Sequence, residues 1–251
     1  MCAERLQLIS ESFPGRPSFD TAVSRALMLK VAEGKVPGTV RLYRPDRIVA
    51  FGGADVRARG FRAAVDAARG RGFASVQRLA GGRAAVFHEG TIAFARSAAD
   101  SDPTARTFAR FEEMSGILAA ALGRLGVDAR VGEVPGEYCP GEYSVNAGGR
   151  TKLAGIGQRI VSGASHIGGV IVAAGSDEVR DVLVPVYDAL ELDWDPATTG
   201  SVADEIPVTW DEVRDAVVDE FARRFEIVGG RLDDETLGLA EKLSEEHAVR
   251  M

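Results

Sequence analysis

The sequence has little of several features that mark other classes of protein. Its 251 residues include two cysteines, Cys2 and Cys139, whose wide separation predicts no disulfide framework and a reducing compartment. The longest apolar run, residues 169–174, is far shorter than the roughly 18 residues that a membrane-spanning helix needs. The first residues lack the basic segment and apolar core of a secretory signal. Together these absences predict a cytoplasmic protein without a membrane partner.

Positive charge is also scarce, and lysine is the scarcer of its two sources. The net charge is −7, whereas general nucleic-acid binders are usually basic, so no nucleic-acid partner is expected. Of the 30 basic residues only four are lysine, and one of them, Lys152, lies in a glycine-rich segment. Lysine carries a compact charge whose protonation the surroundings can tune. Its retention at this position therefore hints at a specific role.

Familiar catalytic and metal-binding motifs are missing as well. No Cys-x-x-Cys, His-Glu-x-x-His or carboxylate cluster predicts a metal site, and no Gly-x-Ser-x-Gly segment predicts a serine hydrolase. Three histidines are present. His88 and His166 fall in predicted strands and are candidates for one shared site, whereas His247 is expected on the surface of a terminal helix. We therefore expect no metal.

The apolar periodicity predicts strands and helices without regular βαβ alternation. Residues 105–125 form the clearest helix, with Phe108, Phe111 and Leu118 on its apolar face. Other helices are predicted after Asp20, over 55–70 and after Ser176. Strands are predicted at 39–43, 47–51, 73–79, 83–88, 91–96, 128–133, 143–147, 152–161 and 165–173. This order predicts an α+β fold with mixed, largely antiparallel sheets and packed helices.

The C-terminal part has a different pattern. Residues 193–207 lack periodicity and contain prolines, which predicts a linker. Thr209 and Glu212 form a capping-box pattern at the start of a helix, and a second helix is predicted over 233–249 after a glycine break. We therefore divide the chain into a main domain, residues 1–195, and a C-terminal helical extension, residues 208–251.

Two glycine-rich segments offer room for a ligand. Between two predicted strands, Gly81 and Gly82 allow close approach of a ligand to the backbone, and Arg78 and Arg83 flank them as donors for an anion. An ordinary β-turn with solvated arginines is the alternative. In the segment that starts at Lys152, small residues including Gly155 leave space beside the polar Gln158. A strand with a glycine bulge would have the same pattern.

Cys139 lies thirteen residues before Lys152, next to Pro140 and Gly141. A proline and a glycine indicate a turn, so the sulfur is expected to be accessible. A reactive cysteine needs a nearby cation or backbone donors, and Lys152 is a candidate cation. The alternative is a small apolar side chain packed under a loop.

Taken together, these segments resemble the family of lipoate–protein ligases and octanoyl/lipoyl transferases, which shares a fold with the biotin protein ligases. The resemblance covers residues 18–195, and Lys152 falls on the family's lysine. Four segments carry it in the family's order: 41–53, 78–95, 150–159 and 165–172. In one departure from the pattern, Thr151 separates Arg150 from Lys152, where the family often has the pair adjacent.

The segment Tyr138-Cys139-Pro140-Gly141 resembles the cysteine-dependent branch of that family. The resemblance implies that Cys139 is a nucleophile, that Lys152 holds the acyl carbonyl, and that an octanoyl or lipoyl group passes through a thioester. It implies as partners an octanoyl or lipoyl donor and lipoyl domains of 2-oxoacid dehydrogenase complexes or the glycine-cleavage H protein.

The resemblance also fixes the expected substrate-binding residues and leaves two alternatives. The residues are Arg78, Gly81, Gly82, Arg83, His88, Gly155, Gln158 and His166. A transferase of this kind needs no cofactor. The first alternative is an ATP-dependent lipoate–protein ligase, which would need ATP and Mg²⁺. The second is a non-catalytic protein that binds lipoyl domains or an acyl ligand.

Overall fold

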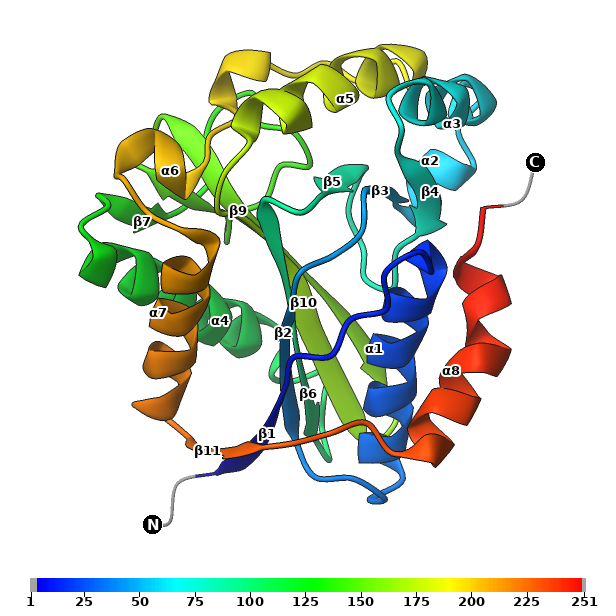
Figure 1. Ribbon diagram of the computed structural model, residues 1–251, viewed down its shortest axis with the longest axis vertical. Coiled ribbons are helices and arrows are strands. Elements are labelled where there is room, and N and C mark those ends of the chain that lie inside the picture. The colour runs from blue at the N-terminus through cyan, green and yellow to red at the C-terminus, as the bar shows by residue number, and fades with distance from the viewer. Residues whose placement is uncertain (1–3, 250–251) are drawn as a thin grey trace.

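A computed structural model of the chain describes residues 4–249 and contains two β-sheets surrounded by helices (Figure 1). The strands of the larger sheet are, in spatial order, β11 (Glu226–Gly229), β1 (Arg5–Ile9), β2 (Thr39–Tyr43), β6 (Thr91–Ala99), β10 (Ala164–Val172), β9 (Thr151–Val161), β8 (Val145–Ala147) and β7 (Ala129–Val131). The smaller sheet consists of β4 (Ala74–Gln77), β3 (Ile48–Phe51) and β5 (Ala85–Phe87). Within the described residues, β1 pairs in parallel with β11 and β2, β3 pairs in parallel with β4, and the other pairs are antiparallel. The predicted α+β class with mixed, largely antiparallel sheets is confirmed.

Helices cover both faces of the larger sheet and one side of the smaller one (Figure 1). The long helices are α1 (Pro17–Ala32), α3 (Phe61–Gly70), α4 (Thr107–Leu125), α5 (Ser176–Ala189), α7 (Trp210–Ala222) and α8 (Asp234–His247). Helix α1 packs on β6 and β10 and is covered by α8, whereas α4 and α7 pack together on the opposite face. Helices α3 and α5 pack against the smaller sheet. No helix among residues 4–249 is long and apolar enough to span a membrane.

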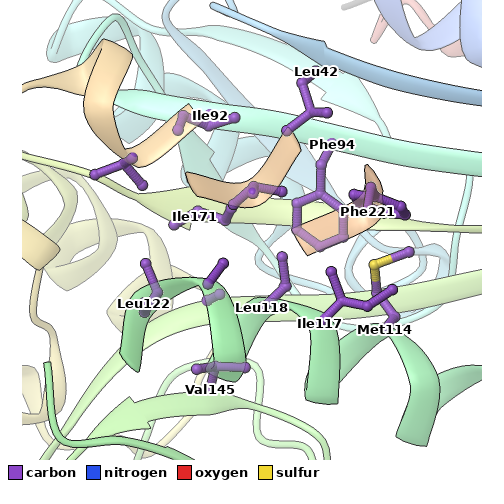
Figure 2. Close-up of a cluster of buried hydrophobic side chains, with 14 of the residues drawn as sticks. Leu42, Ile92, Phe94, Met114, Ile117, Leu118, Leu122, Val145, Ile171 and Phe221 are labelled. Atoms are coloured by element: carbon purple, nitrogen blue, oxygen red, sulfur yellow. The ribbon is translucent and has the colours of Figure 1, made fainter. Parts of the chain in front are cut away.

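The main core lies between the larger sheet and helices α4 and α7 (Figure 2). Leu118 of α4 points toward the sheet, where Phe94 and Ile171 meet it. Complete burial of one such side chain contributes about 1.5–3 kcal/mol. The helix predicted over 105–125 is confirmed, but its predicted apolar face extended one turn too far toward the N-terminus. Phe108 is 67% exposed, because it lies in the first turn of α4, beyond the edge of the sheet.

The N-terminal part differs from its prediction in three places. Strand β1 was not predicted: it has only five residues, and it is paired with β2 and β11, which are distant in the sequence. Asp20 does not cap a helix: α1 begins earlier, at Pro17, a residue preorganised for a first helical position. Asp20 instead forms a buried ion pair with Arg41 of β2. The helix predicted over 55–70 is divided into α2 (Gly53–Val56) and α3.

The C-terminal part is joined to the main sheet. The predicted linker contains a 3₁₀ helix, η1 (Pro196–Thr198), and α6 (Val202–Glu205), whose Val202 is fully buried. Between the two predicted helices, the chain adds strand β11 to the edge of the larger sheet. His247 was predicted to be a surface residue, but it is buried, with Nδ1 2.8 Å from the carbonyl oxygen of Gln77. Cys2 lies outside the described residues.

Strands β9 and β10 approach each other closely at a glycine, which generates a prediction. A Cβ built on Gly169 lies 1.8 Å from the carbonyl oxygen of Gly155, a backbone atom that cannot turn away. Gly169→Ala should therefore lower the free energy of unfolding by about 3 kcal/mol, measured by urea denaturation. As a control, Gly116→Ala in α4 adds a methyl where no atom lies within 4 Å, and should raise stability by about 0.5–1 kcal/mol. Equal stabilities of the two variants would contradict the close strand contact.

Candidate active site

A cavity of about 270 Å³ lies between strands β9 and β10, the start of α4 and the two loops 78–84 and 132–144. Its apolar walls come from Ala85, Phe87, Phe111, Ile156 and Val170. Seven of the ten residues predicted from the sequence also line it: Arg78, Gly81, Gly82, Cys139, Lys152, Gly155 and Gln158. Segments that lie up to 92 residues apart in the chain, from Arg78 to Val170, thus meet at one concave surface.

The backbone of Cys139 has an uncommon conformation that the surrounding groups maintain. Its φ is 44°, in the left-handed region that non-glycine residues seldom occupy. The N–H of Cys139 donates to the hydroxyl of Tyr187, at 2.9 Å, and that hydroxyl donates to the carbonyl of Ala84, at 3.0 Å. Burial raises the pKa of Tyr187, so its hydroxyl keeps the proton that it donates. Strain of this kind persists only where neighbours fix it, and it is common at functional sites.

The sulfur of Cys139 is half-buried and faces two donors from the loop 78–84. The backbone N–H of Arg83 donates to Sγ at 3.1 Å, and Nη1 of Arg78 lies 3.7 Å from it. The Arg83 guanidinium points away to the buried carboxylate of Asp55, at 3.2 Å, and does not line the cavity. Arg83 therefore contributes its backbone to the site, whereas Arg78 contributes its side chain.

Lys152 lies beneath the cysteine loop and is 1% exposed. Its Nζ donates to Glu137 Oε1 at 2.9 Å, to the carbonyl of Tyr138 at 3.0 Å and to the carbonyl of Cys139 at 2.8 Å. An ammonium group has three protons, and these three oxygens account for all of them. The predicted proximity of Lys152 to Cys139 is thus present, but the contact is with the backbone of the cysteine.

Glu137 organises the loop that carries the cysteine. Its carboxylate accepts from the N–H groups of Val134 and Gly141, each at 3.1 Å, from Ser144 Oγ at 2.6 Å, and from Lys152. The side chain is fully buried, and buried carboxylates are stable only when they are paired and hydrogen-bonded in this way. Sequence reasoning gave Glu137 and Tyr187 no role. The position of Glu137 two residues before Cys139 was the one available signal.

Gln158, which also lies on β9, is held by groups outside the cavity. Gln158 Oε1 accepts from Arg110 Nε, and its Nε2 donates to the carbonyl of Thr107, both at 3.2 Å. Arg110 is paired in turn with Asp100. Helix α4 thus fixes the orientation of Gln158 at the rim, next to the stacked rings of Phe111 and Tyr143.

The two histidine candidates are not at the cavity. His166 lines a smaller neighbouring cavity of about 70 Å³, which shares Arg78, Phe87 and Gly169 with the first one. Burial lowers the pKa of His166 to about 4, so the ring is neutral at pH 7. His88 lines neither cavity, and burial lowers its pKa as well.

The structure contains one group of metal-type ligands within residues 4–249. His88, Glu89 and Glu178 have ligand atoms within 4.8 Å of one another. Arg47 forms ion pairs with both carboxylates, so about half of their negative charge is already compensated. The expectation that the chain binds no metal stays a prediction.

The fold and this cavity define a class of protein, and comparisons of the sequence agree with it. The family described as the lipoyl protein ligase A/B catalytic domain matches residues 16–222. The chain therefore belongs to this family, which confirms the resemblance found in its motifs.

Two curated relatives have the same name. The octanoyl-[GcvH]:protein N-octanoyltransferase of Geobacillus kaustophilus is 31% identical over 172 residues, which cover 68% of this chain and 60% of the relative. The protein of that name from Bacillus velezensis is 28% identical over 208 residues, which cover 81% and 72%. The chain thus spans about 60% of the length of the Geobacillus relative.

Solved structures share the fold. A lipoate-protein ligase A bound with ATP has a TM-score of 0.76 at 22% identity, covering 98% of this chain and 95% of that chain. A bipartite lipoate protein ligase from Thermoplasma acidophilum has a TM-score of 0.72 at 21% identity, covering 98% and 93%. At such identities the likeness shows the fold alone.

The buried ion pair of Lys152 and Glu137 generates a prediction for stability. Glu137→Gln leaves an ammonium buried without its counter-charge and should lower the free energy of unfolding by about 3 kcal/mol or more. The double variant Glu137→Gln/Lys152→Met removes that charge and should recover most of the loss. Urea denaturation measures both. The matched control is Asp128→Asn, which breaks the exposed pair with Arg130 and should cost about 0.5 kcal/mol. A double variant less stable than Glu137→Gln would refute this account of the pair.

The depressed pKa of His166 predicts a pH dependence. The unfolded chain takes up a proton on this residue near pH 6.5, whereas the folded protein resists until about pH 4. The unfolded state therefore binds more protons between these values, and acid destabilises the fold. Between pH 7 and pH 5 this residue should remove about 2 kcal/mol from the free energy of unfolding. Denaturation of His166→Gln at both pH values should show a fall smaller by that amount, and an identical fall would rule the effect out.

Proposed function

We propose that this chain is an acyltransferase that moves an octanoyl or lipoyl group, through a thioester on Cys139, to the acceptor lysine of a lipoyl domain. The observation that carries the proposal is the sulfur of Cys139 at the wall of a largely apolar cavity, with a backbone N–H at 3.1 Å and a guanidinium at 3.7 Å. A cation and a backbone donor are the surroundings that favour the reactive thiolate.

The names of the relatives support a donor and an acceptor. Both are called octanoyl-[GcvH]:protein N-octanoyltransferases, after an octanoylated GcvH and a protein. We therefore propose the octanoylated glycine-cleavage H protein as the donor, and lipoyl domains of 2-oxoacid dehydrogenase complexes as the acceptors. A free thiol nucleophile needs a reducing compartment, so we place the reaction in the cytoplasm.

The size and lining of the cavity suit an acyl chain of this length. An engineered apolar cavity of about 150 Å³ holds benzene, with its six carbons. By that scale, a cavity of about 270 Å³ has room for the eight carbons of an octanoyl group. Burial of seven methylene and methyl groups at about 0.8 kcal/mol each would contribute about 5 kcal/mol to binding. Phe87, Ile156 and Val170 would contact the chain.

The transfer takes place in two steps in this proposal. The Cys139 thiolate attacks the acyl carbonyl, a C–S bond forms, and the C–N bond to the donor lysine breaks. The departing amine takes up a proton equivalent to the one that the thiol released. The neutral amine of the acceptor lysine then attacks the thioester, and the C–N bond of the new amide forms as the C–S bond breaks. The nitrogen releases one proton to the solvent, and the sulfur returns to its thiolate. Splitting the exchange in this way replaces one difficult step with two easier ones.

Because one amide is exchanged for another, the proposed reaction needs no external energy source. A transferase of this kind therefore requires neither ATP nor Mg²⁺. An ATP-dependent ligase would need both, and would activate the free acid without using the sulfur of Cys139.

Cys139→Ser tests the proposal. Incubation of the wild-type chain with octanoylated H protein should add one octanoyl group to Cys139, because the thioester is an intermediate. Intact-mass and peptide mass spectrometry should detect it, and hydroxylamine should remove it. In Cys139→Ser the adduct and the octanoylation of an apo lipoyl domain should both disappear, with a rate loss of at least about 10³.

Two further arms of that assay separate the alternatives. The matched control is Cys2→Ser, which should transfer at the wild-type rate. Free lipoate with ATP and Mg²⁺ should release no pyrophosphate, and release that survives in Cys139→Ser would establish a ligase instead. Octanoate that raises the melting temperature without any turnover would indicate a binding protein.

A further inference from the structure

Lys152 was the candidate cation for the Cys139 sulfur, but its ammonium is bound to other groups. The ammonium of Lys152 donates to one carboxylate and two backbone carbonyls, which account for its three protons. To face the sulfur, it would have to leave Glu137, a fully buried carboxylate. Lys152 is thus held by the cysteine loop and not by the cysteine sulfur.

The guanidinium of Arg78 has the position that Lys152 lacks. Its Nη1 lies 3.7 Å from Cys139 Sγ and donates to the carbonyl of Arg83 at 2.9 Å. The N–H of Arg83 reaches the same sulfur at 3.1 Å. One short loop thus presents a full positive charge and a backbone donor to a single atom. A thiolate gains from both, whereas a neutral thiol is a weak acceptor and gains little.

Gly82 makes this contact possible. A Cβ at this position would lie 2.9 Å from the sulfur and 2.7 Å from Arg78 Nη1, and so would fill the space where the two groups approach. Its φ of +113° also belongs to the region in which side chains are strained. Gly82 therefore leaves the space in which the arginine approaches the cysteine sulfur.

We propose that Arg78 is a catalytic residue that stabilises the thiolate of Cys139, and that Lys152 is a positioning residue for the backbone of Cys139. The ion pair of Arg78 with the sulfur can be tested on the thiol alone, while its catalytic consequence rests on the proposed function. An arginine suits this role because its charge persists at all relevant pH values and its several donors can contact the sulfur and the Arg83 carbonyl together.

The test measures the alkylation of Cys139 by iodoacetamide between pH 5 and pH 10. Alkylation forms a C–S bond and releases iodide, and only the thiolate reacts appreciably, so the rate reports the thiolate fraction. A Cys2→Ser background leaves one reactive thiol. In Arg78→Gln, which keeps a donor but loses the charge, alkylation at pH 6.5 should slow about tenfold relative to the wild-type chain.

Two controls separate the charge from the fold. Arg78→Lys keeps the charge and should retain at least half of the wild-type alkylation rate at pH 6.5. Arg62→Met removes an exposed arginine on α3, which does not line either cavity, and should leave the profile unchanged. Circular dichroism and the melting temperature check that each variant is folded.

The proposal is overturned by a folded Arg78→Gln whose Cys139 is alkylated at the wild-type rate at pH 6.5. This result does not depend on acyl transfer. A chain that passes this test but forms no octanoyl adduct would keep the Arg78 assignment and lose the proposed function. A chain that transfers the octanoyl group, but whose alkylation does not depend on Arg78, would keep the proposed function and lose the Arg78 assignment.

Discussion

The site depends on one buried ion pair. Lys152 on β9 and Glu137 in the facing loop are almost without contact with solvent, and each satisfies groups that would otherwise be buried without partners. Through this pair a rigid strand fixes the path of an irregular loop. The two carbonyls that Lys152 binds belong to Tyr138 and Cys139, so the pair sets the backbone at the reactive residue directly. A loop defined by such a pair retains its shape because loss of either charge leaves the other buried and uncompensated.

Lys152 and Arg78 have different roles in this arrangement. The buried lysine determines where the cysteine backbone lies, and the arginine loop determines the electrostatic surroundings of its sulfur. Tyr187 connects the halves, because its hydroxyl bridges the N–H of Cys139 and the carbonyl of Ala84, at the end of the arginine loop. The left-handed backbone of Cys139 follows from these contacts on both sides. Precise placement of a strained residue thus comes from a helix, a strand and a loop acting together.

Much of this site could be predicted from the sequence, but its contacts could not. Cys139 and Lys152 stand out because their residue types are rare in this chain, and Arg78 because it lies close to a double glycine. The fold brings all three to one cavity. Periodicity also predicted most of the strands and helices. Periodicity does not specify, however, which side chains contact each other. Nothing local indicates that Lys152 binds carbonyls, or that His88 lies away from the cavity, since both depend on how distant segments pack. Strand β11 was missed for the same reason: a four-residue strand at an edge depends on its neighbour β1.

Through His247, helix α8 contacts the strand β4, which directly precedes the loop that carries Arg78. His247 ends α8, and its ring meets the carbonyl of Gln77, while Ala248 forms a bridge with Val76. Arg78 follows directly after the last residue of this strand, β4. The terminal helix thus supports the strand that leads into the arginine loop. A substitution in α8 that displaced His247 would therefore alter the support of the loop that carries Arg78, although α8 lines neither cavity.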